Sequence, residues 1–383
     1  MKEWKTYRIG DICKTNTSQY STKEAWDEFL YLDTGNITRN TIDEIARYSS
    51  TAELPSRARR KVISDDIIFS TVRPNQCHFG ILSNPPANLL VSTGFTVITA
   101  NKEIVDPYYL YYYLTQESIV DYLHSIGEQA VSAYPSIKAQ DIEDLEIELP
   151  DLSTQNNIAK TLRALDEKIQ LNRQINDNLE QQASSILSDW TSTHPCKTYK
   201  LSDICKYVSA KCDTGNLTSQ NYISTENMLP NKKGIVDASN IPTGKVTCFK
   251  VDDILIANIR PYFQKIWKAD ISGGCSTDVL CIRSCVESHS PILYWILHQD
   301  AFFEYVMTGA KGCKMPRGDK QHIMNWTIEL PEPEYWADIA TQLGAVDQRL
   351  AYNRIESIYL SNLRDTLLPK LMSGELKINE IDC

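Results

Sequence analysis

The chain has 383 residues, 42% of them hydrophobic and 23% charged, a composition typical of globular proteins with ordinary cores. No apolar run approaches the roughly 20 residues of a membrane-spanning helix, and the first ten residues lack the apolar core of a secretion signal, so we expect no membrane partner and a cytoplasmic location. A formal net charge of −10 excludes broad, charge-driven attraction to nucleic acid, because phosphate neutralisation needs Lys and Arg. Any DNA contact must therefore be local.

The chain contains one module written twice. Residues 5–14 return as residues 197–206, identical at seven of ten positions. Further pairs follow in unchanged order: Asp65-Asp66 with Asp252-Asp253, Arg73-Pro74 with Arg260-Pro261, Ser92-Thr93 with Ser276-Thr277, Ile147–Pro150 with Ile328–Pro331, and Asn172-Arg173 with Asn353-Arg354. A shared framework with divergent connections is typical of a scaffold that carries different recognition loops, and neutral drift of surface loops after duplication is the alternative.

Each module is predicted to be α+β. Short segments rich in β-branched and aromatic residues, punctuated by Gly, Pro, Asn and Asp, indicate strands within 62–72, 95–98 and 245–259. Tyrosines and leucines at three- and four-residue spacing indicate one helix over 106–123 and its counterpart over 290–307.

Each segment that resembles a catalytic motif lacks a residue that the motif requires. Asn84–Ala87 resembles the N-P-P-aromatic tetrad of adenine methyltransferases, but alanine replaces the aromatic that would stack on a flipped base. Gly244-Lys245 is followed by Val246, where a phosphate loop needs Ser or Thr. The 11 cysteines include no C-x-x-C pair, and the six histidines form no H-E-x-x-H. We expect reduced thiols and no catalytic residue, metal or cofactor in this chain.

Candidate DNA-binding residues fall in three kinds of segment. Arg73 and Arg260 follow strands and precede proline, and because both copies share them they favour positioning over sequence reading; an ion pair with an acid is the structural alternative. The cluster of Arg57, Arg59, Arg60 and Lys61 has no counterpart in the second copy and favours half-specific contact, although a charged strand edge explains it equally well. Neighbouring polar or aromatic candidates are Asn75, Asn258 and Tyr262.

A glycine-rich basic segment, Gly309–Lys320, is the strongest candidate. Its glycines allow close approach of backbone amides to phosphates, and its charges come from Lys311, Lys314, Arg317 and Lys320. The corresponding first-copy segment, Gly127–Ser136, carries an acid and no base. Its candidates are Gln129, Ser132 and Tyr134, with an ordinary polar loop as the alternative.

Two long amphipathic helices follow the modules, the first capped by Ser153 or Thr154. Each apolar seam extends over about 35 residues, about 50 Å at 1.5 Å per residue, and each contains an asparagine at the equivalent step. If the helices pack antiparallel, Asn172 and Asn353 could pin their alignment; alternatively each faces solvent or a partner chain. The candidate pairing residues are Leu165, Ile169, Asn172, Asn176, Leu179, Val346, Leu350, Asn353, Leu360, Leu367 and Leu371.

This order of elements resembles the specificity subunit of type I restriction-modification systems. The residues that carry the resemblance are the two Arg-Pro pairs, the Ser-Thr pairs, the Pro150 and Pro331 junctions, Leu165–Arg173 and the ending Leu367–Leu376. The resemblance implies two target-recognition domains (1–150 and 193–331) and two spacer helices (151–192 and 332–383) that pack as an antiparallel coiled coil. An approximate two-fold relation between the domains would suit two half-sites on a duplex.

The resemblance also implies a non-catalytic protein that reads a bipartite, asymmetric sequence in double-stranded DNA. Two methyltransferase subunits would dock on it and methylate adenine with S-adenosylmethionine, and restriction endonuclease subunits would cut DNA with ATP, so that both cofactors belong to the partners. A two-domain scaffold that binds only protein is the second hypothesis, supported by the acidic net charge. A concealed enzyme is the third, and no general base or nucleophile can be named for it.

Overall fold

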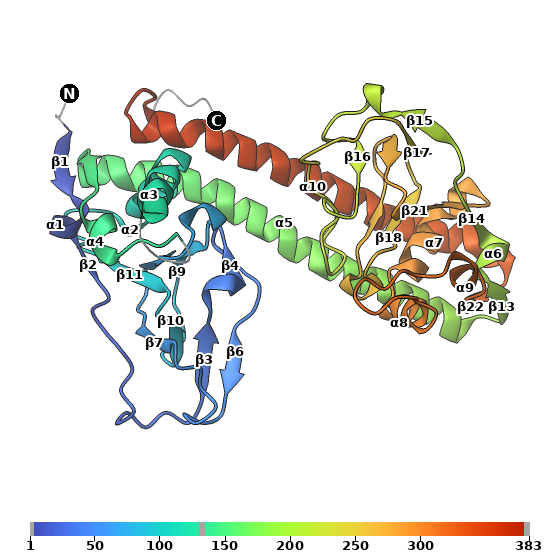
Figure 1. Ribbon diagram of the computed structural model, residues 1–383, viewed down its shortest axis with the longest axis horizontal. Coiled ribbons are helices and arrows are strands. Elements are labelled where there is room, and N and C mark those ends of the chain that lie inside the picture. The colour runs from blue at the N-terminus through green and yellow to red at the C-terminus, as the bar shows by residue number, and fades with distance from the viewer. Residues whose placement is uncertain (1–3, 130–134, 379–383) are drawn as a thin grey trace. The chain divides into compact units, whose positions relative to one another are not determined.

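The computed structural model describes residues 4–129 and 135–378, which divide into two compact units. The first contains residues 1–169 and 358–383, and the second contains residues 170–357. Each unit therefore holds one module together with part of both long helices (Figure 1). No helix in the described ranges is both long and apolar enough to cross a membrane.

The first module contains two four-stranded sheets, a strand pair that closes it, and short helices. The sheets have the orders β2-β11-β8-β9 and β6-β3-β10-β7, and β1 pairs antiparallel with β12. The strands are β1 (Lys5–Arg8), β2 (Cys13–Thr15), β3 (Phe29–Leu32), β4 (Ile37–Thr38), β5 (Thr41–Ile42), β6 (Ala46–Tyr48), β7 (Ala58–Lys61), β8 (Asp66–Ser70), β9 (Phe79–Leu82), β10 (Leu89–Ser92), β11 (Phe95–Ala100) and β12 (Glu146–Leu149). The helices are α1 (Ile9–Ile12), α2 (Pro107–Leu114), α3 (Glu117–Gln129), α4 (Ala139–Glu143) and the 3-10 turns η1 (Thr34–Asn36) and η2 (Pro74–Gln76).

The second module repeats this plan. Its sheets have the orders β14-β21-β18-β19 and β15-β17-β20-β16, and β13 pairs antiparallel with β22. The strands are β13 (Cys196–Lys200), β14 (Cys205–Tyr207), β15 (Lys211–Asp213), β16 (Tyr222–Ile223), β17 (Lys245–Phe249), β18 (Ile254–Ala257), β19 (Ile266–Lys268), β20 (Gly273–Cys275), β21 (Val279–Ser284) and β22 (Thr327–Pro331). The helices are α6 (Leu201–Ile204), α7 (Ser290–Leu297), α8 (Asp300–Thr308), α9 (Lys320–Met324) and the 3-10 turns η3 (Thr214–Asn216), η4 (Pro261–Phe263), η5 (Glu287–His289) and η6 (Pro333–Tyr335). The predicted α+β repeat is confirmed.

The central strand of each module is buried on both faces, which explains its continuous apolar run. In β8, Ile67 and Phe69 pack toward the helices, whereas Ile68 packs toward the second sheet. In β18, Ile254 and Leu255 divide in the same way. In both units, the sheet that contains β8 or β18 therefore lies between the helices and the other four-stranded sheet.

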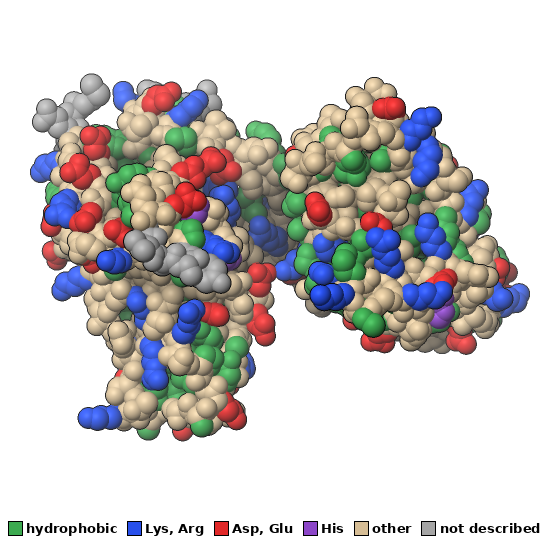
Figure 2. Space-filling view, in the orientation of Figure 1, with side chains coloured by type: hydrophobic (Ala, Val, Ile, Leu, Met, Phe, Trp, Pro, Cys, Tyr) green, Lys and Arg blue, Asp and Glu red, His purple; other side chains and the backbone are tan. Residues whose placement is uncertain are grey.

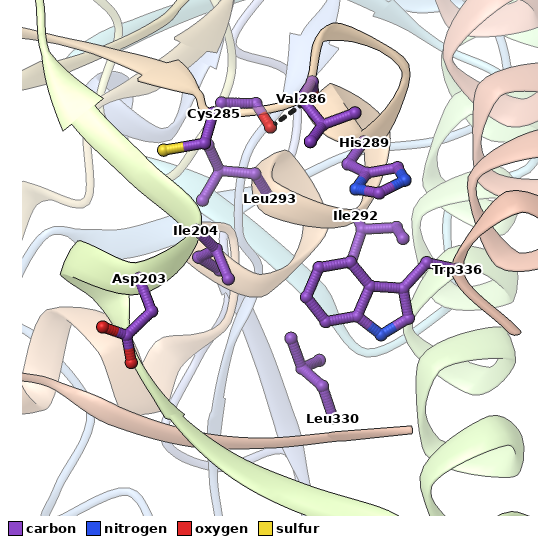
Figure 3. A pocket seen from close by; sticks show the side chains of 10 residues that line it. Asp203, Ile204, Cys285, Val286, His289, Ile292, Leu293, Leu330 and Trp336 are labelled. Atoms are coloured by element: carbon purple, nitrogen blue, oxygen red, sulfur yellow. Dashed lines mark hydrogen bonds between the residues drawn. The ribbon is translucent and has the colours of Figure 1, made fainter. Parts of the chain in front are cut away.

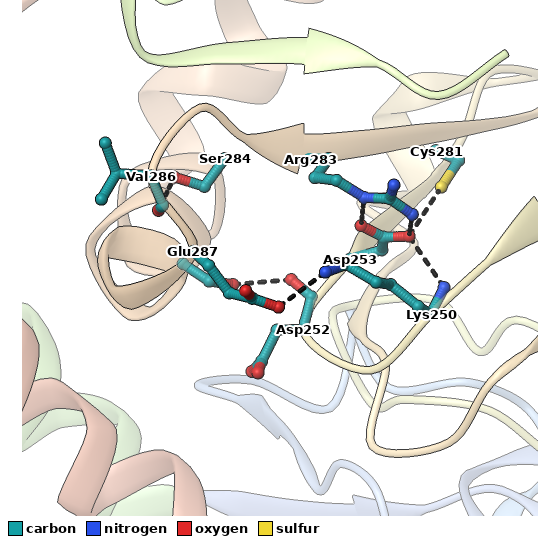
Figure 4. Close-up of polar contacts among 9 residues, drawn as sticks. Lys250, Asp252, Asp253, Cys281, Arg283, Ser284, Val286 and Glu287 are labelled. Carbon is teal, nitrogen blue, oxygen red and sulfur yellow. Dashed lines mark hydrogen bonds and ion pairs between the residues drawn. The ribbon is translucent and has the colours of Figure 1, made fainter. Parts of the chain in front are cut away.

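The same backbone turn precedes both central strands, β8 and β18. Asp65 and Asp252 adopt left-handed conformations, with φ of 69° and 71°, and the following aspartates are buried. Asp66 accepts a hydrogen bond from the amide of Ile63, and Asp253 binds the Arg283 guanidinium through two contacts of 2.6 Å (Figure 4). These paired acids thus form turns at the starts of the two strands.

Two local predictions need correction. The single helices predicted over 106–123 and 290–307 are each two helices, because Gln299 adopts an extended conformation (ψ 147°) before α8, and α2 ends at Leu114 before α3 begins at Glu117. The apolar spacing continues across both breaks and hides them. The first long helix is not capped by Ser153 or Thr154: Asp151 accepts from the amide of Thr154 at 3.2 Å.

The two long helices, α5 (Leu152–Thr193) and α10 (Trp336–Met372), pack antiparallel, as predicted. Three hydrogen bonds between the helices in the second unit show this direction: Asn172 with Glu356, Asn176 with Asn353, and Trp190 with Gln342. The residue number rises along α5 while the number of its partner falls along α10. In the first unit, the apolar side chains of Leu162 and Leu371 share one core.

Candidate nucleic-acid interface

The Arg-Pro pairs form the same strained turn in both units. Arg73 and Arg260 have φ of 46° and 52°, in the left-handed region that residues other than glycine rarely adopt. Each is followed by a proline that opens a 3-10 turn, and Cys77 and Gln264 close the two turns with φ of 56° and 51°. Because the surrounding structure must offset this strain twice, the turn is a candidate functional element.

Each turn is hydrogen-bonded to the candidate DNA-binding loop of its own module, here called the recognition loop (Gly127–Ser136 or Gly309–Lys320). The Arg73 amide donates to the Pro135 carbonyl at 2.9 Å, and the Arg260 amide donates to the Pro316 carbonyl at 2.8 Å. An isolated β-bridge follows each bond, between Val72 and Ser136 and between Ile259 and Arg317. The structure thus brings together two segments that lie far apart in the sequence.

The basic loop of the second unit is closed at its base. Lys311 and Arg317 exchange backbone hydrogen bonds of 2.9 Å, which hold their side chains beside each other. Both have acidic neighbours: Lys311 pairs with Asp319 at 2.7 Å, and Arg317 pairs with Asp278 at 3.2 Å. The sequence did not reveal these two pairings, and the two acids reduce the net charge of the loop.

The remaining candidates of this unit differ in accessibility. Lys314 is exposed and makes no hydrogen bond or ion pair to the described ranges, and the Lys320 ammonium lies 5.7 Å from the Tyr207 ring. Arg260 and Tyr262 are exposed on the turn. Asn258 is half-buried, and its carbonyl oxygen is buried without a hydrogen-bond partner, so this atom does not face solvent.

In the first unit, three of the four residues of the basic cluster lie on β7. Figure 2 shows Lys and Arg side chains gathered where Figure 1 draws this strand. Strand alternation separates Arg59 and Lys61 from Arg60, and Arg57 is exposed before the strand. Lys61 forms an ion pair with Glu24.

Arg60 is the least satisfied of these cations. Its Nε and one terminal nitrogen are buried without hydrogen-bond partners, and burial lowers the pKa of its guanidinium. The outer side of β7 is not an open edge, because Tyr20 donates to Arg59 and Lys61 donates to Ser18 through backbone bonds. Protection of an unpaired edge therefore does not explain this charge.

The loop of the first unit is only partly described. Arg73 is half-buried, whereas Asn75 and Gln129 are exposed. Ser132 and Tyr134 lie outside the described residues.

The seam asparagines are both fully buried and do not bond to each other. Asn172 donates to Glu356 at 2.7 Å, and Asn353 donates to Asn176 at 2.8 Å. Each asparagine is bonded to the facing helix instead of facing solvent. Among the other candidates for helix pairing, Ile169, Val346 and Leu371 are buried, and Leu165, Leu179, Leu350, Leu360 and Leu367 are half-buried.

Other hollows in the described chain have less to offer a ligand. A cavity of about 50 Å³ in the second unit is lined mainly by apolar side chains, with Asp203 and His289 also at its wall (Figure 3). The indole N–H of Trp336, which lines it too, already donates to Pro331 at 2.7 Å. Among the described residues, no group of three or more His, Cys, Asp or Glu could hold a metal ion.

A polar hollow of the second unit contains two titratable groups with displaced pKa values. Burial raises the pKa of Glu180 to about 7, and Asp177 adds to this effect whereas Lys232 opposes it. Burial lowers the pKa of His298 to about 3. Lys232 itself pairs with Asp300 at 2.5 Å.

Replacing Glu180 with glutamine should stabilise the chain at pH 8 but not at pH 4. A carboxyl whose folded pKa is raised contributes its stability fully below the unfolded value of 4.5 and loses it as pH rises through about 7. We expect the variant to exceed the wild type by about 1–3 kcal/mol at pH 8 in urea unfolding. The exposed Glu304→Gln is the control, and an equal gain at pH 4 and pH 8 would contradict the pKa assignment.

Comparison with known proteins shows what this chain is similar to. Residues 1–181 match the model of the type I restriction modification DNA specificity domain. The chain is 32% identical over 190 residues to the type I restriction enzyme HindI specificity subunit of Haemophilus influenzae, covering 50% of this chain and 41% of that protein. It is 20% identical over 429 aligned positions to the MjaIX specificity subunit of Methanocaldococcus jannaschii, covering 99% and 95%.

The fold is also found among solved structures. The type I restriction-modification S subunit from M. genitalium has a TM-score of 0.54 and 16% identity, with 96% of each chain covered. The match to the first relative spans less than half of that protein's length, whereas the second is covered almost completely. Residues 1–181, a little under half of the chain, are therefore similar to the type I restriction modification DNA specificity domain, and the chain shares its fold with the M. genitalium S subunit.

Proposed function

We propose that this chain is a non-catalytic DNA-recognition subunit of a type I restriction-modification complex. The observation that carries the proposal is the strained Arg-Pro turn, present once in each unit and bonded each time to the adjacent recognition loop. Two similar frames with different loops suit a bipartite, asymmetric site, because shared residues can position the duplex while unshared residues distinguish bases. The recognition domains would be residues 1–150 and 193–331, and the helices residues 151–192 and 332–383.

The contacts with DNA would come from both kinds of segment. Arg73 and Arg260 would position the backbone, and Lys314 and Arg317 would bind phosphates of one half-site. In the other half-site, the exposed Arg57 and its neighbours Arg59 and Arg60 would bind the DNA backbone. The HindI and MjaIX relatives are specificity subunits of type I restriction enzymes, which supports this role.

Partner subunits would dock on the long helices. Tyr352 and Ile355 of α10 lie three residues apart on one helix face of the second unit, and their side chains are 55% and 60% exposed. Exposed apolar stripes of this kind mark protein interfaces. We assign this face to a methyltransferase subunit, with two such subunits and restriction subunits in the complete enzyme; S-adenosylmethionine and ATP would be bound by those partners.

Salt dependence of DNA binding tests the proposal. With the methyltransferase-bound chain, replacing both Lys314 and Arg317 by alanine should reduce the slope of log affinity against log salt by about 2, since each phosphate contact contributes about 0.9. The matched control replaces Lys197 and Lys250, which pair with Glu332 and Glu287 and also remove two charges. Equal slopes for both double variants would contradict a phosphate contact at this loop.

A two-domain protein scaffold is the alternative, favoured by the net charge of −10 and the exposed stripe on α10. It predicts stable assembly with partner subunits and no retention of duplex DNA at any salt concentration. Retention of one duplex sequence over a scrambled duplex of the same length would exclude it.

A further inference from the structure

The two Arg-Pro turns share their frame but differ at their tips. The two residues after the proline are Asn75 and Gln76 in the first unit and Tyr262 and Phe263 in the second. All four side chains are exposed, Tyr262 by 49% and Phe263 by 37%. An amide pair in one unit is thus replaced by an aromatic pair in the other.

The frame holds both tips rigidly. A left-handed residue begins and ends each turn, and the proline between them fixes its own φ. The second turn is supported on another side as well, because Asn231 donates to the Phe263 carbonyl at 2.8 Å and Lys232 donates to the Gln264 carbonyl at 2.9 Å. Since the backbone is the same in both units, only the side chains at the tip can make the two turns bind differently.

The surroundings of the aromatic tip suit a polyanion. The Lys265 ammonium lies 6.0 Å from the Phe263 ring, and the two tip rings lie 4.7 Å apart. The turn is bonded to the loop that carries Lys314 and Arg317. An exposed apolar tip among cations fits the apolar base surfaces of DNA, whose phosphates satisfy the cations.

The tip of the first unit offers different chemistry. Side-chain amides of Asn and Gln donate and accept at once, and this pattern matches the edge of adenine in the major groove. Aromatic side chains instead contact the thymine methyl or a base face.

We propose that these tips determine sequence specificity: Asn75 and Gln76 read one half-site by hydrogen bonds, and Tyr262 and Phe263 read the other by apolar contact. The inference rests on the proposed function, because it presumes that the turns face DNA. It assigns discrimination to the two positions after each Arg-Pro pair, and it includes Gln76 and Phe263, which were not among the sequence candidates. The signal available in the sequence was a framework shared by both copies that encloses two differing residues.

The test exchanges the tips in the full chain assembled with its methyltransferase subunits. One variant carries Asn75→Tyr and Gln76→Phe, and the other carries Tyr262→Asn and Phe263→Gln; each is used to select preferred sites from randomised duplexes. Val251→Asn, which replaces another exposed apolar residue of the second unit, is the control. We expect each exchange to change base preference about tenfold to a hundredfold within one half-site only, with affinity for non-specific duplex changed less than about threefold.

Three outcomes would overturn the inference. Unchanged preferences in both half-sites would show that the tips do not read bases. Loss of methyltransferase assembly in the second variant, with unchanged preference in the complex that remains, would show that the aromatic tip contacts protein. A wild-type complex that selects no sequence would contradict the proposed function itself, and this failure is distinguishable because it appears before any substitution.

Discussion

Replacing Asp347 with alanine is expected to lower the free energy of unfolding of the second unit by about 3–5 kcal/mol. Its carboxylate lies on α10, 2.6 Å from the Lys268 ammonium of β19, and accepts from the Trp295 indole of α7 at 2.8 Å. The Lys268 and Asp347 side chains are only 14% and 12% exposed. Removing the carboxylate leaves a buried ammonium and an indole N–H without this acceptor, which costs more than the net value of the intact pair.

Two effects reduce the size of this loss. Burial raises the pKa of Asp347, although Lys268 and the indole oppose that rise, so the ionised carboxylate is costly to bury even in its native site. Lys268 also lies 3.0 Å from Asp252, so its ammonium keeps one acidic partner after the substitution. We therefore expect the lower part of the range, about 3 kcal/mol.

Urea unfolding of the full chain would measure this effect, with Asp347→Asn as the matched variant. Asparagine removes the charge but keeps an oxygen for the indole, so it should cost less than alanine. A loss below about 1 kcal/mol for alanine would show that the pair is effectively solvent-screened.

The first unit has a similar acid at the equivalent position of its long helix, bonded to an aromatic donor and to a cation. Asp166 on α5 accepts from the Tyr112 hydroxyl at 2.7 Å and pairs with Arg364 of α10 at 2.6 Å. The neighbouring residues Leu165 and Val346 were predicted from the seam, but the acids beside them were not. An acid repeated next to an apolar seam in both copies was the available signal.

The fold could be predicted where the pattern is local and repeated. Duplicated anchors revealed two modules, and a long a/d series revealed α5 and α10, because periodicity reports which face is buried. The register of the helix pair could not be predicted. Asn172 and Asn353 occupy equivalent steps, yet each bonds to the facing helix at another position, Glu356 and Asn176.

For the candidate site, the sequence suggested residues but not their geometry. Residue type and sharing between copies identified Arg73 and Arg260, but their left-handed backbone depends on bonds to Pro135 and Pro316, which lie about 60 residues away in the sequence. In the same way, counting charges could not reveal that Asp278 pairs with Arg317, because this contact is formed by folding.

Exchanging the first recognition domain should have the largest effect on function. If residues 1–150 are replaced by the corresponding domain of a family member with another specificity, methylation of the original site should fall about a thousandfold or more, to the level of non-specific sequence. The new site should contain a new first half and the original second half. Mapping methylated adenines genome-wide, with the chimera and with the parent, would measure both changes.

The structure determines how this exchange has to be made. Tyr112 lies inside the exchanged segment, but its partner Asp166 lies outside it, and Tyr109 shares a core with Leu371 of α10. A donor that lacks these two tyrosines would leave the half-buried Asp166–Arg364 pair without its hydroxyl and would leave a void in the core. The chimera should therefore retain Tyr109 and Tyr112, and the parent carrying Tyr112→Phe is the stability control. With those contacts kept, a change in both half-sites would contradict the assignment of residues 1–150 to one half, whereas an unchanged site would contradict their role in reading DNA.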